Sequence, residues 1–97
     1  MKRIPPFKLV PEPLNEDATK LAAFKWAGGD VGKRHRIGGT PDFITETNFP
    51  ACECGETMTF YGQLDSLNDE FVLADCGIIH VFVCFECFQT KSILSSA

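Results

Sequence analysis

The sequence has little positive charge and no long apolar run. Nine basic and thirteen acidic side chains give its 97 residues a formal charge of −4. General nucleic-acid binding needs a basic face that displaces counterions from phosphates, so this charge disfavours it. The longest apolar stretch, residues 77–85, is far shorter than the roughly 20 residues that a bilayer requires. Because no apolar segment follows the charged N-terminus, we see no signal peptide and expect a cytoplasmic protein.

Groups that carry out catalysis are also scarce. The chain has two histidines, and its Gly-Gly pairs lack the spacing of a phosphate-binding loop. Its four carboxylates between residues 65 and 75 fall at predicted turns, where such groups are usually solvated or cap backbone amides. His80 lies within an apolar segment, where we expect a core residue and not a ligand. We therefore expect no enzymatic activity.

The length suits one domain, and we expect residues 1–97 to form a single zinc-binding, β-rich unit. A domain this small buries only about 60–65% of the surface that its unfolded chain exposes. A second source of stability beside the core is therefore often needed. Nine phenylalanines predict a core of large rings packed between strands.

The first half of the chain has weak secondary-structure signals. Residues 1–13 contain four prolines and predict an extended arm, with Phe7 able to anchor it as part of an edge strand. Residues 15–26 hold the one candidate helix, which Asn15 or Asp17 can cap. Three glycines and a proline predict a turn-rich loop over residues 32–41, followed by a short extended segment over 43–45.

The second half has the pattern of β-structure. Residues 57–64 have strand propensity. Residues 71–74 and 78–83 predict a hairpin with Gly77 in its turn, and the second arm is apolar on both faces, as in a central strand. The predicted fold class is mainly β with at most one short helix (α+β): a small antiparallel sheet with a zinc-ribbon-like site of four cysteines.

That site rests on two close cysteine pairs, Cys52-x-Cys54 and Cys84-x-x-Cys87. Zinc favours four thiolates in a tetrahedron, and two short turns can each present two sulfurs to one ion. The strands between the pairs can bring the turns together. We therefore predict one structural Zn²⁺ per chain, held by Cys52, Cys54, Cys84 and Cys87. The first pair is one residue closer than the usual knuckle.

Other interpretations of the cysteines remain open. They are alternatively buried apolar residues, a redox motif at Cys84–Cys87, or ligands of iron. A redox motif usually opens a helix, and residues 88–93 lack a helical pattern. Cys76, the fifth cysteine, is predicted to be a free thiol, although Cys76 or His80 would complete the metal site if a first-pair cysteine does not bind.

A basic run from Lys33 to Arg36 stands in the predicted loop. We predict that Arg34, Arg36, Gly38 and Gly39 form an exposed, partner-binding tip. The guanidinium group of arginine binds a carboxylate through two parallel hydrogen bonds. Glycine has no side chain and therefore lets its backbone approach another chain closely. The alternative is a solvated loop that covers one end of the sheet.

Three separated motifs resemble a known family. They are G-x-R-H-R-I-G-G-x-P-D-F-I over residues 32–44, P-x-C-x-C-G-x-x-M-x-F-x-x-Q-L-D over 50–65, and D-x-G-x-I-x-V-F-x-C over 75–84. Together they resemble the YwqG-like bacterial domain and, more distantly, the programmed cell death protein 2 family. The resemblance implies a β-rich fold and, from the eukaryotic relatives, a chaperone-like binding role. It also implies these signature positions: Gly38, Gly39, Pro41, Met58, Gln63 and Asp75.

These observations favour a zinc-stabilised protein-binding module of bacterial origin. Specific forms of that role are a chaperone-like protein or an immunity (antitoxin) protein, whose acidic charge suits a basic toxin. The alternatives are a metal-dependent enzyme with an open zinc site and a nucleic-acid-binding zinc ribbon. A site with four thiolates leaves no position for water, and the net charge disfavours nucleic acid.

Overall fold

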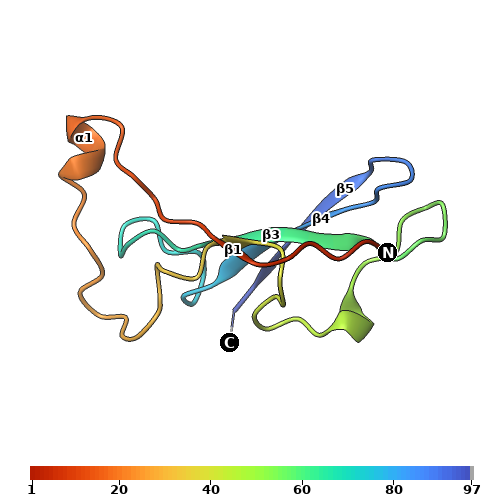
Figure 1. Cartoon of the computed structure of the whole chain (residues 1–97). Coiled ribbons are helices and arrows are strands. Elements are labelled where there is room, and N and C mark those ends of the chain that lie inside the picture. The colour runs from red at the N-terminus through yellow and green to blue at the C-terminus, as the bar shows by residue number, and fades with distance from the viewer. Residues whose placement is uncertain (97) are drawn as a thin grey trace.

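The computed structural model describes residues 1–96 and confirms the mainly β fold class. In these residues one antiparallel sheet has five strands in the order β1-β2-β3-β4-β5 (Figure 1). The strands are β1 (Phe7–Lys8), β2 (Arg36–Ile37), β3 (Thr59–Asp65), β4 (Ile78–Val83) and β5 (Thr90–Ser95). The sheet follows chain order, so every neighbouring pair is antiparallel and no crossover is needed.

In the part of the chain that the structure describes, helical structure is limited to single turns. Helix α1 (Glu16–Thr19) begins where predicted, because the Asn15 side chain accepts a hydrogen bond of 2.9 Å from the Ala18 amide. It ends after one turn and not at residue 26, since none of its side chains is buried and a short helix needs such packing. The second turn is the 3-10 helix η1 (Glu46–Asn48). No helix within residues 1–96 is long and apolar enough to cross a membrane.

Strands β3 and β4 form the centre of the sheet, and this pairing corrects the predicted hairpin. β4 pairs with β3 and β5, whereas residues 71–74 form no strand. Ala74 and Cys76 adopt positive φ angles of 53° and 55°, which turns this segment away from an extended ladder. The segment is therefore part of the connection from β3 to β4.

Two further segments differ from the prediction. Residues 43–45 form no strand, because Phe43 takes a positive φ of 68°. Residues 90–95, for which no strand was predicted, form β5 at the edge of the sheet, with Val83 opposite Thr90 and Ile78 opposite Ser95. An edge strand tolerates the polar side chains that made this segment weak as a strand signal.

The predicted glycine-rich loop is tied into the sheet. It contains β2, which pairs with β1 on one side and with β3 on the other. Gly38 donates its amide to the Tyr61 carbonyl, and Gly39 donates to the Ile4 carbonyl, both at 2.8 Å. A Cβ at Gly38 would come to 2.5 Å from the Ile4 carbonyl oxygen. These glycines therefore allow close approach of the chain's own N-terminal arm.

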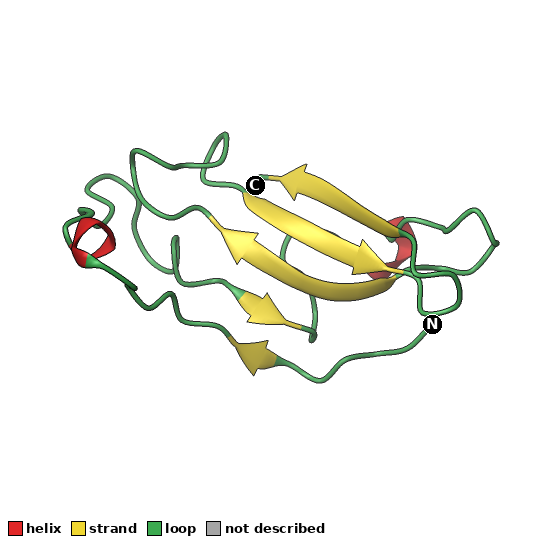
Figure 2. Cartoon of the chain, turned by 90° about the horizontal axis from the view of Figure 1, so that it is seen from above, coloured by secondary structure: helices red, strands yellow, loops and turns green. Residues whose placement is uncertain are grey.

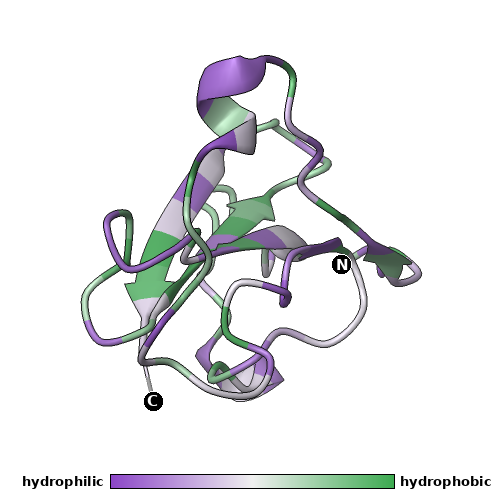
Figure 3. Ribbon diagram, turned by 90° about the vertical axis from the view of Figure 1, so that its left-hand side faces the viewer, coloured by the Kyte–Doolittle hydropathy of each residue, from purple (hydrophilic) through white to green (hydrophobic). Residues whose placement is uncertain are grey.

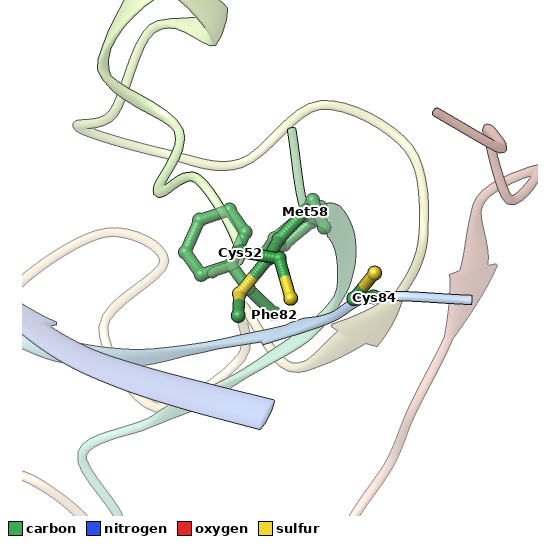
Figure 4. Packing of buried hydrophobic residues seen from close by; sticks show 5 residues of the cluster. Cys52, Met58, Phe82 and Cys84 are labelled. Carbon is green, nitrogen blue, oxygen red and sulfur yellow. The ribbon is translucent and has the colours of Figure 1, made fainter. Parts of the chain in front are cut away.

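The apolar core is small and lies beside the cysteines. It contains Met58, Phe60 and Phe82 together with two of the predicted ligands, Cys52 and Cys84 (Figure 4). The ring centroids of Phe60 and Phe82 lie 5.8 Å apart, and Phe49 packs against Phe82 at 5.1 Å. Because a core of this size stabilises a fold only weakly, a metal ion bound by the cysteines would be a further source of stability.

The molecule is elongated, with principal extents of 44 × 28 × 20 Å, and its two ends differ. At one end lie the cysteine turns, residues 51–57 and 84–89, which we call the metal end (Figure 1). At the other end, residues 9–33 and 66–76 form what we call the acidic lobe, and α1 belongs to it (Figure 1). The Lys25 amide joins the two segments of the lobe by donating to Asp69 Oδ2 at 2.8 Å.

Candidate metal centre

The pairing of β3 with β4 brings the two cysteine turns together. Thr59, the first residue of β3, lies opposite Val83, the last residue of β4. The first turn immediately precedes β3, and the second immediately follows β4. Both therefore lie at the same end of the sheet, although 29 residues separate Cys54 from Cys84.

The first turn is a small hairpin. Ala51 and Thr57 form an isolated antiparallel bridge, and the Cys52 amide donates to the Glu56 carbonyl at 2.8 Å. Gly55, with a φ of 95°, donates its amide to the Cys52 carbonyl at 2.9 Å. Glycine suits this left-handed position, so the chain turns tightly within a C-x-C-G sequence.

The second turn joins β4 to β5. The Cys84 amide donates to the Gln89 carbonyl at 2.9 Å, and the Phe88 amide donates to the Cys84 carbonyl at 2.8 Å. Cys87 is therefore followed by a strand and not by a helix. This arrangement lacks the helix N-terminus that activates the thiolate in typical redox C-x-x-C motifs.

The four predicted ligands form one cluster, with all four Sγ atoms within 4.8 Å of one another. Across the two turns, Cys52 Sγ lies 2.9 Å from Cys87 Sγ, and Cys54 Sγ lies 3.6 Å from Cys84 Sγ. A tetrahedral zinc site with Zn–S bonds of about 2.3 Å has S–S edges of roughly 3.8 Å. Both cross-turn separations are shorter than this edge, so a bound ion would require the two turns to move slightly apart.

The cluster is partly enclosed by the core. Cys52 and Cys84 are 4% and 2% exposed, whereas Cys54 and Cys87 are exposed. Two ligands thus continue the apolar core, and two face solvent at the end of the sheet. A bound ion would crosslink the core to both turns, which is the role of a structural metal site.

Backbone amides favour a thiolate at Cys84. The amides of Cys87 and Glu86 donate to its sulfur and lower its pKa to about 7. At Cys52 the Cys54 amide acts in the same direction, but the Cys87 thiol and burial outweigh it and raise the pKa to about 12. The surroundings thus favour a thiolate at Cys84 and a thiol at Cys52.

Gln89 is a contributor that the sequence analysis missed. Its Oε1 accepts hydrogen bonds from Cys52 Sγ at 3.1 Å and from the Glu53 amide at 3.3 Å. It therefore reaches from the second turn to the first and orients it. No local pattern in the sequence indicates this contact, because it depends on the two turns meeting at one end of the sheet.

Neither Cys76 nor His80 belongs to the cluster. His80 is fully buried on β4, and its Nε2 lies 2.7 Å from the Asp42 carbonyl oxygen. Burial lowers the pKa of His80, which keeps the ring neutral. The Cys76 carbonyl accepts a bond from Arg34 at 2.8 Å, at the end of the sheet where β4 begins. His80 is therefore the core residue that the sequence predicts.

The basic run is not an exposed tip, which corrects that part of the prediction. The Arg34 side chain, 15% exposed, forms a two-point ion pair with Asp65, whose side chain is fully buried. Arg36 pairs with Asp42 at 3.0 Å. Both arginines therefore bind carboxylates of their own chain: Asp65 lies at the end of the neighbouring strand β3, and Asp42 lies in the loop that follows β2. The role of Arg34, Arg36, Gly38 and Gly39 in partner binding stays a prediction.

Asp65 was expected in a solvated turn and is instead the centre of a buried polar network. Beside the Arg34 side chain, its Oδ2 accepts from the amides of Gly32 and Arg34 at 2.7 and 3.0 Å. Next to it on β3, Gln63 is 1% exposed and donates to the Arg34 carbonyl at 2.7 Å and to Asp42 Oδ2 at 3.1 Å. The network thus holds the loop of residues 32–42 against the sheet.

Comparison with known proteins leaves the cluster as the main guide to function. No family model, curated protein or solved structure matches the chain. The resemblance to the YwqG-like domain therefore stays a prediction.

Proposed function

We propose that this chain is a zinc-stabilised protein-binding module. The observation that carries the proposal is the cluster of four cysteine sulfurs at the end of the sheet. Four thiolates are the donor set of closed structural zinc sites, and they leave no coordination position for a substrate or water. In this proposal the ion stabilises the fold, and no reaction takes place at it.

The acidic lobe is the surface that we propose for partner binding. It contains seven acidic and three basic side chains, and its formal charge of −4 equals that of the whole chain. It also carries strongly exposed apolar side chains, with Leu14 94% and Trp26 89% exposed. Figure 3 shows the lobe side of the molecule, where α1 is mostly hydrophilic. An exposed tryptophan is a residue type that often anchors a partner at the centre of an interface.

The partner with complementary chemistry is a basic protein with apolar pockets. Opposite charge speeds the encounter, and buried tryptophan side chains commonly dominate binding energy. Such a partner suits an immunity protein that covers a basic toxin, or a chaperone-like protein that shields a basic client. Both roles agree with the predicted family resemblance and with a cytoplasmic protein of bacterial origin.

The test compares the two ends of the molecule by affinity capture from a native lysate. We expect a double variant, Leu14→Ala with Trp26→Ala, to lose a specific partner that the wild type retains. The matched control is Phe88→Ala, which removes a 68% exposed aromatic ring at the metal end. Retention of the partner by the lobe variant, with loss in the control, would assign binding to the metal end and overturn this proposal.

A further inference from the structure

One face of the sheet is apolar and exposed. We propose that two copies of the chain associate through this face to form a two-layer β-sandwich. We call it the open face, and its principal residues are Phe7, Ile37, Leu64, Ile79, Val81 and Leu94. Association through it is a property separate from metal binding and from the proposed role of the acidic lobe.

Strand register places these side chains together, because directly paired residues of antiparallel strands point to the same face. Leu64, Ile79 and Leu94 form one row across β3, β4 and β5. Phe7, Ile37 and Val81 belong to the next row, with Gly62 and Ser92 in the same register. The second row thus crosses all five strands and the first crosses three, both without a charged residue.

The opposite face of the sheet is covered. It carries Phe60, Gln63 and Phe82, all buried, beneath the segment that includes Ile44 and Phe49. On the open face, in contrast, Leu64 is 50%, Leu94 52% and Phe7 58% exposed. Figure 2 shows the strands from the open side, with η1 behind them, and no described segment passes in front. A sheet of this kind normally buries its apolar face against a second layer.

Charge favours a second copy as that layer. Two identical acidic chains repel each other wherever their charged surfaces meet. The two rows of the open face contain no charged side chain. The acidic lobe, which has a formal charge of −4, lies at one end of the molecule beyond the strands. Two copies can therefore appose their open faces with both lobes outside the contact. Two identical sheets can pack face to face about a two-fold axis, with the same rows contributed by each copy.

The size of the face predicts a weak dimer. Strands β3, β4 and β5 have six or seven residues and β1 and β2 have two each. At about 3.4 Å per residue and about 4.8 Å between strands, they give a face of roughly 350 Å². Two such faces bury on the order of 700 Å² together, less than the roughly 1,200–2,000 Å² of stable interfaces. The dimer should therefore form reversibly as protein concentration increases.

The test is sedimentation velocity of the metal-loaded full chain between about 10 µM and about 1 mM, where interfaces of this size dissociate. We expect the wild type to shift from monomer to dimer over this range. Leu94→Glu should raise the dissociation constant at least about tenfold, because it buries a carboxylate in each copy. The matched control is Leu14→Glu in the acidic lobe, an identical change at a 94% exposed leucine, which should leave the constant unchanged.

A second variant guards against misfolding. Ser92→Glu places a carboxylate on the open face at an exposed position that is already polar, opposite Val81. It should weaken the dimer as Leu94→Glu does while the near-UV circular dichroism stays that of the wild type. A wild type that is monomeric at all concentrations overturns the proposal. The open face would then be a candidate surface for binding a different protein. Equal weakening by Leu14→Glu and Leu94→Glu also overturns it.

Discussion

The metal end and the acidic lobe are organised by different interactions. At the metal end, two of the four cysteines are part of the apolar core, and the aromatic rings of Phe49, Phe60 and Phe82 pack beside them. In the lobe, single hydrogen bonds such as those of Asn68 with Ala22 and of Lys25 with Asp69 connect long turns. The comparison teaches that apolar packing beside clustered cysteines organises one end of this small protein, whereas hydrogen bonds between turns organise the other.

The largest expected effect is the loss of a metal ligand. Cys84→Ser should abolish metal binding and much of the folded structure, because a structural ion contributes its binding free energy to folding. Metal content and circular dichroism measure the two losses. Cys76→Ser is the matched control, since Cys76 lies outside the cluster, and it should keep both properties. An unchanged metal content in Cys84→Ser would contradict the assignment.

The second effect concerns the buried ion pair of Arg34 with Asp65, where the sheet meets the acidic lobe. Arg34→Ala leaves the Asp65 carboxylate buried without its partner and should destabilise the fold by about 3–5 kcal/mol in urea unfolding. Arg3→Ala is the control, because the Arg3–Glu46 pair is exposed, and it should have little effect. Similar losses in both variants would show that the buried pair has no special structural role.

A smaller effect is the response of the same pair to acid. Burial by itself would raise the pKa of Asp65. The Arg34 side chain and the amides of Arg34 and Gly32 lower this pKa by more than burial raises it, so the net pKa lies below its usual value. The stability that this carboxylate contributes is present above its unfolded pKa of about 3.9 and is lost as the pH falls through the folded value.

Unfolding midpoints of wild type and Asp65→Asn from pH 7 downward measure this contribution. The wild type should be more stable at pH 7, and the difference should shrink only below about pH 4. Metal release in acid affects both proteins, so their difference isolates Asp65. A difference that is constant with pH would contradict a charged Asp65 in the folded state.

The smallest effect is expected in the lobe. Trp26→Ala should change the free energy of unfolding by less than about 0.5 kcal/mol, because its side chain is 89% exposed. Phe82→Ala, at a fully buried ring of the core, should cost about 3–5 kcal/mol in the same measurement. A large loss in Trp26→Ala would show that the lobe stabilises the fold and remove the contrast between the ends.

The sequence predicts the metal end well because its signals are local. Cys52 and Cys54, like Cys84 and Cys87, are close in sequence, so their spacing alone indicates two ligand turns. The strand over residues 78–83 is also visible from its apolar pattern, and the structure confirms it as β4. The strands that pair with β4 were not predictable in the same way. Periodicity identifies a strand, whereas pairing with β3 or β5 depends on long-range packing.

Long-range contacts explain the other differences. Arg34 and Asp65 are 31 residues apart, and no local pattern shows that strand pairing will bring them together. The glycines at 38 and 39 do indicate close backbone approach, but their sequence cannot tell whether the approaching chain is foreign or the chain's own arm. A charged residue in a predicted loop is therefore weak evidence that the residue is exposed. A pair of closely spaced cysteines is stronger evidence of a metal site.

Cobalt substitution tests the central claim most directly. We expect the apo-protein to take up one Co²⁺ per chain with the visible absorption of a tetrahedral site of four thiolates, and Zn²⁺ to displace it. Cys54→Ser, in the closely spaced pair, should change the spectrum to that of three sulfur ligands and weaken binding. A Cys54→Ser spectrum identical to that of the wild type, or the absence of a thiolate–cobalt spectrum in the wild type, would contradict a zinc centre built from these four cysteines.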